Sequence, residues 1–351
     1  MISPLAPLPA ASGSFLLAWL LVALACGLDR LIGDPHGLLH PVQVMGWCIA
    51  RLRRLAEALA ADRPRWLRAA GVLITLLLVL GSLLAGWAVE RLALMLPGLG
   101  LPLLLIGLAS ALAGGSLRRA VQQVLAALPD QAEARRRLAW IVGRDVSDLD
   151  EPEMLRAAAE TASENAVDGL FAPLFWMLLG AALWAWDQQS PSGAGLLPGP
   201  LALAWAFKAA STLDSMLGYR RGSLRWLGTA GARLDDGLTW LPCRLVALSL
   251  PLAAGRPAAC GQWLRAALRE GAADPSPNAG VSQAAYAHAA GVRLGGLNRY
   301  ADGLRAKPLL AVDQPPADRA AVVRILGLSD RLQLLWLLVA ALVALLVSLQ
   351  P

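Results

Sequence analysis

Apolar stretches long enough to cross a lipid bilayer recur along this chain and restrict what it can fold into. The clearest is Ala69 to Val89, which carries no charged residue, and about 20 apolar residues span the hydrocarbon core as a helix. Charged residues make up only 16% of the 351 residues and hydrophobic ones 57%, whereas soluble proteins carry about a quarter charged residues. The sequence therefore predicts an all-α, polytopic membrane protein with one domain, 1–351.

Further apolar segments raise the expected number of membrane segments to roughly five to seven. Pro242 and Pro251 interrupt the run from Leu238 to Ala254, which favours a buried or re-entrant segment over a clean span. The other apolar segments are Phe15 to Leu28, Leu99 to Ala113, Leu170 to Trp186, Leu201 to Phe207 and Leu332 to Leu349.

The net charge of +6 resides in arginine-rich regions between these stretches. In a membrane protein such regions indicate loops that face the cytoplasm, and they do not point to nucleic-acid binding. Four scattered cysteines without a C-x-x-C pattern, and three histidines, favour neither a zinc site nor a disulfide framework. No positive segment precedes the first apolar run, so a cleaved signal peptide is not expected. The polar regions are 29–68, 114–169, 208–237 and 255–331.

The stretch from Gly143 to Pro173 holds eight of the 25 acidic residues and leads directly into an apolar run. Asp150, with Pro152 and Glu153 after it, predicts a capped helix start. In that helix the acids Glu160, Glu164 and Asp168 follow one another at a spacing of four, so we expect them on one face. Acids at a membrane boundary are costly unless they hold a cation or pair with bases. The alternative is a solvated helix face with capping acids.

Three more polar blocks border apolar runs. KAASTLDSMLGYRRG, if helical, puts Lys208, Thr212, Ser215 and Tyr219 on one face. In DPSPNAGVSQ two prolines predict a rigid loop, followed by a helix from about Val281 whose first N–H groups favour anions. LDRLIGDPHGLLHPVQVMGW, with Asp34 and His40, is typical of a structured loop and not of a helix.

Taken together, these blocks resemble the CobD/CbiB family, the adenosylcobinamide-phosphate synthases of cobalamin biosynthesis. The similarity runs in the family's order from about residue 28 to 310 and departs from it at Gly237, Leu238 and Thr239. The matching strings are GDPHGLLHPVQVMG, GRDVSDLDEPEMLRAAAETASENAVDGLFAPLFW, KAASTLDSMLGYR, ARLDDGLTWLPCRL and DPSPNAGVSQAAYAHAAGVRLGGLNRYADG.

The resemblance implies a ligase that forms an amide bond. It would join the ring D propionate of adenosylcobyric acid to aminopropanol or aminopropanol phosphate, with consumption of ATP and with Mg²⁺. Which amine is used stays open. The chain has no G-x-x-x-x-G-K-[ST] pattern, so the use of ATP rests on the resemblance alone.

Within the matching blocks we assign roles by chemistry, because Mg²⁺ prefers carboxylates together with phosphates. The metal candidates are Glu164, Asp168, Asp235 and Asp236, with Glu160 as a further carboxylate. The catalytic candidates are Glu160, Glu164, Asn165, Asp168, Lys208 and Asp214. The substrate- or nucleotide-binding candidates are Asp34, His40, Tyr219, Arg220, Arg233, Asp274, Asn278, Asn298 and Lys307.

Two other function classes stay open. An intramembrane Mg²⁺-dependent prenyl transferase would favour a D-D-x-x-D motif, but Gly-Leu-Thr follows Asp235 and Asp236. A transporter, or a scaffold for corrinoid enzymes, predicts polar residues spread along several spans, whereas here they cluster at span ends. We expect a multi-pass protein of the inner membrane with its site facing the cytoplasm. The expected partners are the bilayer, the corrinoid and the amine, and either a homo-oligomer or a complex with late cobalamin-assembly enzymes.

Overall fold

The computed structural model describes residues 14–33, 40–189, 196–300 and 303–349. The fold is predominantly helical, as the composition predicts. Four helical segments are long and apolar enough to cross a membrane, and a fifth is reached if α4 (Pro97–Ala111) and α5 (Gly114–Ala127), bent by 43°, form one span. Only with this fifth span does the count reach the lower end of the expected range, five to seven. The four are α1 (Ser14–Ile32), α3 (Pro64–Met95), the continuous run Glu151–Gln189, and α14 (Arg319–Ser348).

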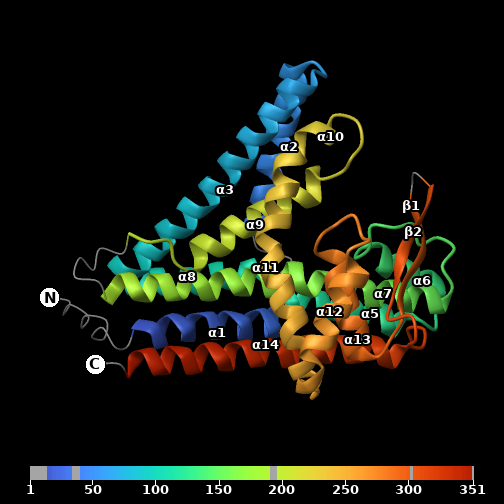
Figure 1. Ribbon diagram of the computed structural model, residues 1–351. Helices are drawn as coiled ribbons and strands as arrows, with labels where there is room; N and C mark the ends of the chain where they lie inside the picture. Colours follow the sequence, from blue (N-terminus) through green and yellow to red (C-terminus); the bar gives the residue numbers. More distant parts are fainter. Residues whose placement is uncertain (1–13, 34–39, 190–195, 301–302, 350–351) are drawn as a thin grey trace.

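The run Glu151–Gln189 connects the polar part of the protein to its apolar part. It consists of α7 (Glu151–Ala166), the π-helical turn η2 (Val167–Phe171) and α8 (Ala172–Gln189). Helix α8 lies alongside α1, and α1 lies alongside α14 (Figure 1). Around α7 gather α5, α6 (Gln131–Ala139), α13 (Ala279–Ala290) and the β-hairpin.

Two further groups of helices pack against this frame. Helices α2 (Pro41–Ala60) and α3 form a hairpin that projects from the bundle (Figure 1). Helix α9 (Pro200–Leu217) packs on both α3 and α8, and α11 (Thr229–Ala253) packs on α9. The remaining elements are α10 (Leu224–Leu227), the 3₁₀ turn η3 (Pro257–Ala259) and α12 (Cys260–Gly271).

The β-hairpin is absent from the sequence expectation. Strands β1 (Leu294–Tyr300) and β2 (Gly303–Leu310) pair antiparallel, with Asn298 opposite Arg305. A register shift between Leu294 and Gly296 coincides with positive φ angles at Gly295 and Gly296, +86° and +110°. Glycine adopts such angles without steric cost, so the hairpin depends on these two residues.

One prediction about helix boundaries is wrong. The stretch around Asp34 and His40 is not one loop, because α1 continues to Ile32 and α2 starts at Pro41. The His40 side chain accepts a hydrogen bond from the Val42 N–H and Gln43 caps the His40 N–H; proline at the first helical position fits this start. Asp34 itself lies outside the described residues.

Over Leu238 to Ala254, for which a buried or re-entrant segment is expected, α11 continues through Pro242 and Pro251 as one helix. A proline loses one helical hydrogen bond and kinks a helix without always ending it. Helix α11 is not among the segments that are apolar enough to span a membrane, in keeping with the expectation that this region does not cross.

Close contact between α3 and its neighbours depends on glycine. A Cβ atom on Gly86 would lie 2.7 Å from Ala202 Cα of α9, and one on Gly71 would lie 2.1 Å from the Leu227 carbonyl oxygen of α10. Both distances are below van der Waals contact with backbone atoms, which cannot give way as side chains can. Small residues therefore let α3 lie directly against α9, which carries Lys208 and Asp214.

A buried carboxylate fixes the start of α9. Glu90 of α3 is 1% exposed and accepts hydrogen bonds from the N–H groups of Gly199, Leu201 and Ala202 at 2.8, 2.7 and 2.9 Å. The first N–H groups of a helix have no partner within the helix, and the helix dipole favours a negative charge there. Glu90 thus joins α3 to the N-terminus of α9.

Substitution of Glu90 tests this joint. Glu90→Ala leaves three buried N–H groups without an acceptor and should lower the free energy of unfolding by about 3 kcal/mol. Glu90→Gln keeps one acceptor oxygen and should cost about half as much. Thermal unfolding of the purified protein in detergent measures both. Glu133→Ala is the control and should change little, because Glu133 is only partly buried and its ion pairs with Arg136 and Arg137 lie within α6. Equal melting curves for all three variants would contradict the capping role.

Candidate functional site

The acid-rich helix begins as the sequence predicts. Asp150 accepts a hydrogen bond from the Glu153 N–H at 2.9 Å, and α7 starts at Glu151 with Pro152 in its first turn. The α-helical hydrogen-bond pattern ends at η2, where the Ala172 N–H donates to the Val167 carbonyl oxygen across a π turn. Asp168 lies in this wider turn. Single π turns inside α-helices are frequent at functional sites, and this one sets the direction of Asp168 differently from a plain helix.

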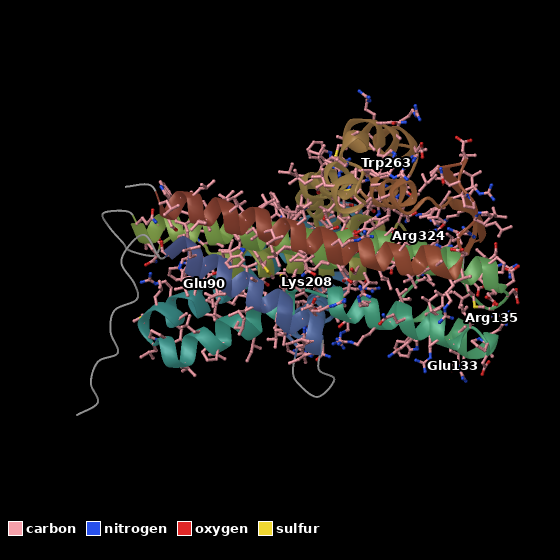
Figure 2. All side chains as sticks on the ribbon, turned by 90° about the horizontal axis from the view of Figure 1, so that it is seen from below. Glu90, Glu133, Arg135, Lys208, Trp263 and Arg324 are labelled. Carbon is pink, nitrogen blue, oxygen red and sulfur yellow. The ribbon has the colours of Figure 1, made fainter. Side chains whose placement is uncertain are left out.

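Acids from three elements converge beside η2. Asp168 interacts electrostatically with Asp235 of α11, Asp214 of α9 and Glu164 of α7, and with Lys208 of α9. Asp236 interacts with Asp214 and with Arg220. In Figure 2 Lys208 lies along the long helices, between Glu90 on one side and Glu133 and Arg135 on the other. We call Glu164, Asp168, Asp214, Asp235 and Asp236 the acid cluster.

Burial in this cluster disfavours the ionised carboxylates. Burial, and next the negative charges of Asp214 and Asp236, raise the pKa of Asp235 to about 7. The pKa of Asp214 is raised by burial and then by Asp236. Burial also raises the pKa of Asp236, against the opposing effect of Arg220. Carboxylates whose pKa is raised in this way by burial and by neighbouring charges are frequent in functional sites.

A second group of polar residues joins the acid cluster to the DPSPN loop. Gln283 of α13 donates to Glu164 at 2.6 Å, and the Lys307 ammonium pairs with Asp274 at 3.0 Å. Burial alone would lower the pKa of Lys307, but the charges of Glu164 and Asp274 outweigh it and raise that pKa. Lys307 is therefore a protonated, half-buried cation beside the acids.

The DPSPN loop is also tied to α11. Asn278 is the residue before α13, as expected, but its side chain makes no capping bond. Instead its amide donates to the Asp236 carbonyl oxygen at 2.9 Å and accepts from Arg244 at 2.6 Å. The loop thus holds the backbone that carries Asp235 and Asp236.

Glu160 belongs to a different environment, in which all its charge is paired. It is 1% exposed and contacts Arg144, Arg156 at 3.2 Å and the Gly295 N–H at 2.9 Å. The two arginines also donate to Asn298 Oδ1, at 2.7 and 3.0 Å. This network fastens the β-hairpin to α7. Arg144 and Arg156 are absent from the sequence assignment; their place near the acidic block was the one available signal.

The other assigned residues lie apart from the acid cluster or at its margin. Asn165 donates to Thr161, within α7. His40 caps α2. Tyr219 follows the end of α9 at Leu217, so it does not share the helical face predicted for it; Arg221 stacks on its ring at 5.0 Å. Arg233 is exposed on α11. The structure thus brings together Glu164, Asp168, Lys208, Asp214, Arg220, Asp235, Asp236, Asp274, Asn278 and Lys307.

The chemistry of the cluster fits a Mg²⁺ ion that arrives with phosphate groups. Across the described ranges, no three His, Cys, Asp or Glu side chains are close enough to hold a metal by themselves. Mg²⁺, however, usually takes one or two carboxylates and fills its other positions with water and substrate phosphates. Asp235 Oδ1 is buried and has no hydrogen-bond partner among the described residues, which leaves a ligand atom available.

Comparisons with a family model and with individual proteins point to the same family. The sequence model of the CobD/Cbib protein family matches residues 22–329. "Cobalamin biosynthesis protein CobD" of Synechocystis is 40% identical over 94% of this chain and 93% of its own length. "Cobalamin biosynthesis protein CobD" of Geobacter metallireducens is 39% identical over 84% and 86%, and "Cobalamin biosynthesis protein CbiB" of Salmonella choleraesuis is 38% identical over 81% and 83%. No solved structure matches the chain.

The raised pKa of Asp235 predicts a pH dependence of stability. With the folded-state pKa at about 7 and the usual value at 3.8, the folded state holds the proton more tightly. Stability should therefore fall as pH rises between those values, by up to about 1.4 kcal/mol per pH unit. Asp235→Asn cannot ionise, so its unfolding temperature should fall less from pH 5 to pH 7 and should exceed that of the wild type at pH 8.

Thermal unfolding in detergent with a metal chelator measures this difference. The control is Asp145→Asn, because Asp145 is exposed and its pKa is lowered by hydrogen bonds from Ser147; it should keep the wild-type slope at these pH values. Parallel curves for Asp235→Asn and the wild type would refute the inference that the buried carboxyl resists ionisation.

Proposed function

The chain belongs to the CobD/CbiB protein family, and from that premise we propose that it is an ATP-dependent amide ligase of cobalamin biosynthesis. The names of its relatives support the pathway. The reaction itself rests on the matching sequence blocks and on the chemistry of the acid cluster. It joins the ring D propionate of adenosylcobyric acid to aminopropanol or its phosphate, and the product is adenosylcobinamide or its phosphate.

The observation that carries the proposal is the meeting of five acids with Lys208, Lys307 and Arg220. A carboxylate is a poor electrophile and has to be activated before an amine can attack it. In the proposed reaction the propionate oxygen attacks the terminal phosphorus of ATP, and ADP leaves. The amine then attacks the acyl phosphate carbon and expels phosphate, and the nitrogen gives up a proton.

The cations would act on the phosphate oxygens. Phosphoryl transfer is catalysed mainly by positioning and by neutralisation of charge. Lys208 lies on α9 and Lys307 on β2, so the two ammonium groups approach the acid cluster from different elements. We assign them, together with Arg220, to the phosphates of the nucleotide and of the activated propionate.

The acids divide between two tasks. Glu164, Asp168, Asp235 and Asp236 would hold Mg²⁺, which supplies positive charge to the phosphate groups when bound. Asp214 lies at the edge of the cluster with a raised pKa. A base works best when its pKa approaches the pH of the reaction, so we assign Asp214 to accept the proton of the attacking amine. We propose that this site faces the cytoplasm, where ATP is available.

Genetics tests the function directly. A strain that lacks the protein should accumulate cobyric acid and should regain cobalamin when cobinamide is supplied, since the block then lies upstream of the supplement. Corrinoids in cell extracts are measured by chromatography. A deletion strain without a second copy that still converts cobyric acid to cobinamide would rule out the ligase.

Glu164 tests the role of the acid cluster. Glu164→Gln keeps the shape and an acceptor oxygen for Gln283 but removes the charge. Amide formation should fall at least about tenfold, the loss that corresponds to about 1.4 kcal/mol of transition-state stabilisation, and added Mg²⁺ should restore part of it. The assay uses purified protein, adenosylcobyric acid, ATP and either amine.

The matched control is Glu153→Gln, a partly exposed acid in the first turn of the same helix. It removes the same charge from α7 far from the cluster and should cost little activity. Wild-type turnover of Glu164→Gln at limiting Mg²⁺ would refute a metal-binding role for Glu164 and would mean that this face of α7 is structural. It would not contradict the proposed ligase reaction.

A further inference from the structure

An apolar groove lies between α2, α3 and α9. It has a volume of about 520 Å³, in the range of pockets that hold small molecules. Its walls are Val44, Met45 and Leu52 of α2, Leu78 and Ala85 of α3, and Trp205 of α9. Because α3 is long and apolar enough to span a membrane, we expect this groove to lie at the level of the hydrocarbon part of the bilayer.

The groove continues along α2 into a second hollow of about 640 Å³. This second hollow is an open face of α2, and it adjoins the groove because Cys48 and Leu52 line both. The second hollow also contains Arg51 and Arg54. Both arginines are exposed, and neither forms an ion pair with a described residue. The combined groove is therefore apolar at one end and carries two positive charges at the other.

The charged end of the groove coincides with the polar end of the membrane helix. Helices α2 and α3 form an antiparallel hairpin (Figure 1), so Arg51 and Arg54 lie toward the start of α3. That start carries Arg65 and Arg68. The exposed Trp47 lines the charged hollow, and tryptophan is enriched where the bilayer meets water.

We propose that this groove binds an anionic phospholipid. One acyl chain occupies the apolar part beside Leu78 and Trp205, and the phosphate contacts Arg51 and Arg54. Such a lipid has an apolar chain and a charged headgroup, and the groove offers a place for each. The hydrocarbon chain would lie along α3, and the headgroup would reach the two arginines at the membrane interface. Basic residues at this level are attracted to anionic lipids of the membrane surface. The proposal does not depend on the catalytic function.

Lipid-dependent stability tests the charged end. The full-length protein is purified in detergent, and its unfolding temperature is measured with added phosphatidylglycerol, phosphatidylcholine or glycerol 3-phosphate. Phosphatidylglycerol should raise it in a saturable manner, while the zwitterionic lipid and the soluble phosphate should have little effect. The double variant Arg51→Ala/Arg54→Ala should lose at least about two thirds of the shift.

The matched control is Arg265→Ala/Arg269→Ala, which removes two exposed positive charges from α12, outside the groove. It should keep the full response to phosphatidylglycerol. An equal loss in the control, or an equal response to both lipids, would mean a nonspecific effect of charge or of lipid and would overturn the proposal.

Gly81 tests the apolar end. It lines the groove, and a Cβ atom there would meet nothing within 4 Å, so Gly81→Leu should fold while it fills the channel. The variant should no longer retain phosphatidylglycerol in native mass spectra, whereas the wild type should retain it. Lipid retention by Gly81→Leu, or a lipid-free dimer of the wild type in the same spectra, would also overturn the proposal, the second because a copy of the chain would then cover the groove.

Discussion

Several carboxylates are buried among apolar helices, and the need to stabilise them determines how many of the elements are joined. A buried ion is costly unless it is paired or hydrogen-bonded, and the chain satisfies its buried acids in different ways. Glu90 receives three backbone N–H groups at the start of α9. Glu160 receives two guanidinium groups and a backbone N–H. In both cases the carboxylate oxygens are hydrogen-bonded, and each acid fastens one element to another.

The acid cluster is satisfied less completely, and this difference separates it from the structural acids. Asp168 and Asp235 face other acids as well as Lys208, and Asp235 keeps a buried oxygen without a partner among the described residues. Such an arrangement is stable only if protons or a bound cation compensate. The acids whose burial costs stability are thus the ones to which we assign metal and phosphate in the proposed reaction.

The sequence predicted the parts of this fold that depend on local patterns. The cap at Asp150, the apolar spans and the rigid DPSPN loop are determined by residues close together in the chain. The attachment of the Glu160 network to the hairpin could not be predicted. Gly295 lies 135 residues from Glu160, Asn298 lies more than a hundred residues from the two arginines, and the hairpin has no periodic sequence pattern. The π turn at Asp168 and the passage of α11 through two prolines depend on packing against other helices, which a sequence pattern does not contain.

The position of Lys307 on β2 has a consequence for the biosynthesis of the protein. The acids of α7 and η2 leave the ribosome well before this lysine, and the helix that carries them continues directly into an apolar segment. The nascent chain therefore contains Glu164 and Asp168 while one of the cations that later balances them has not yet been translated. Full charge balance, and with it a settled position of α7 relative to the bilayer, has to wait until the hairpin has been synthesised and docked.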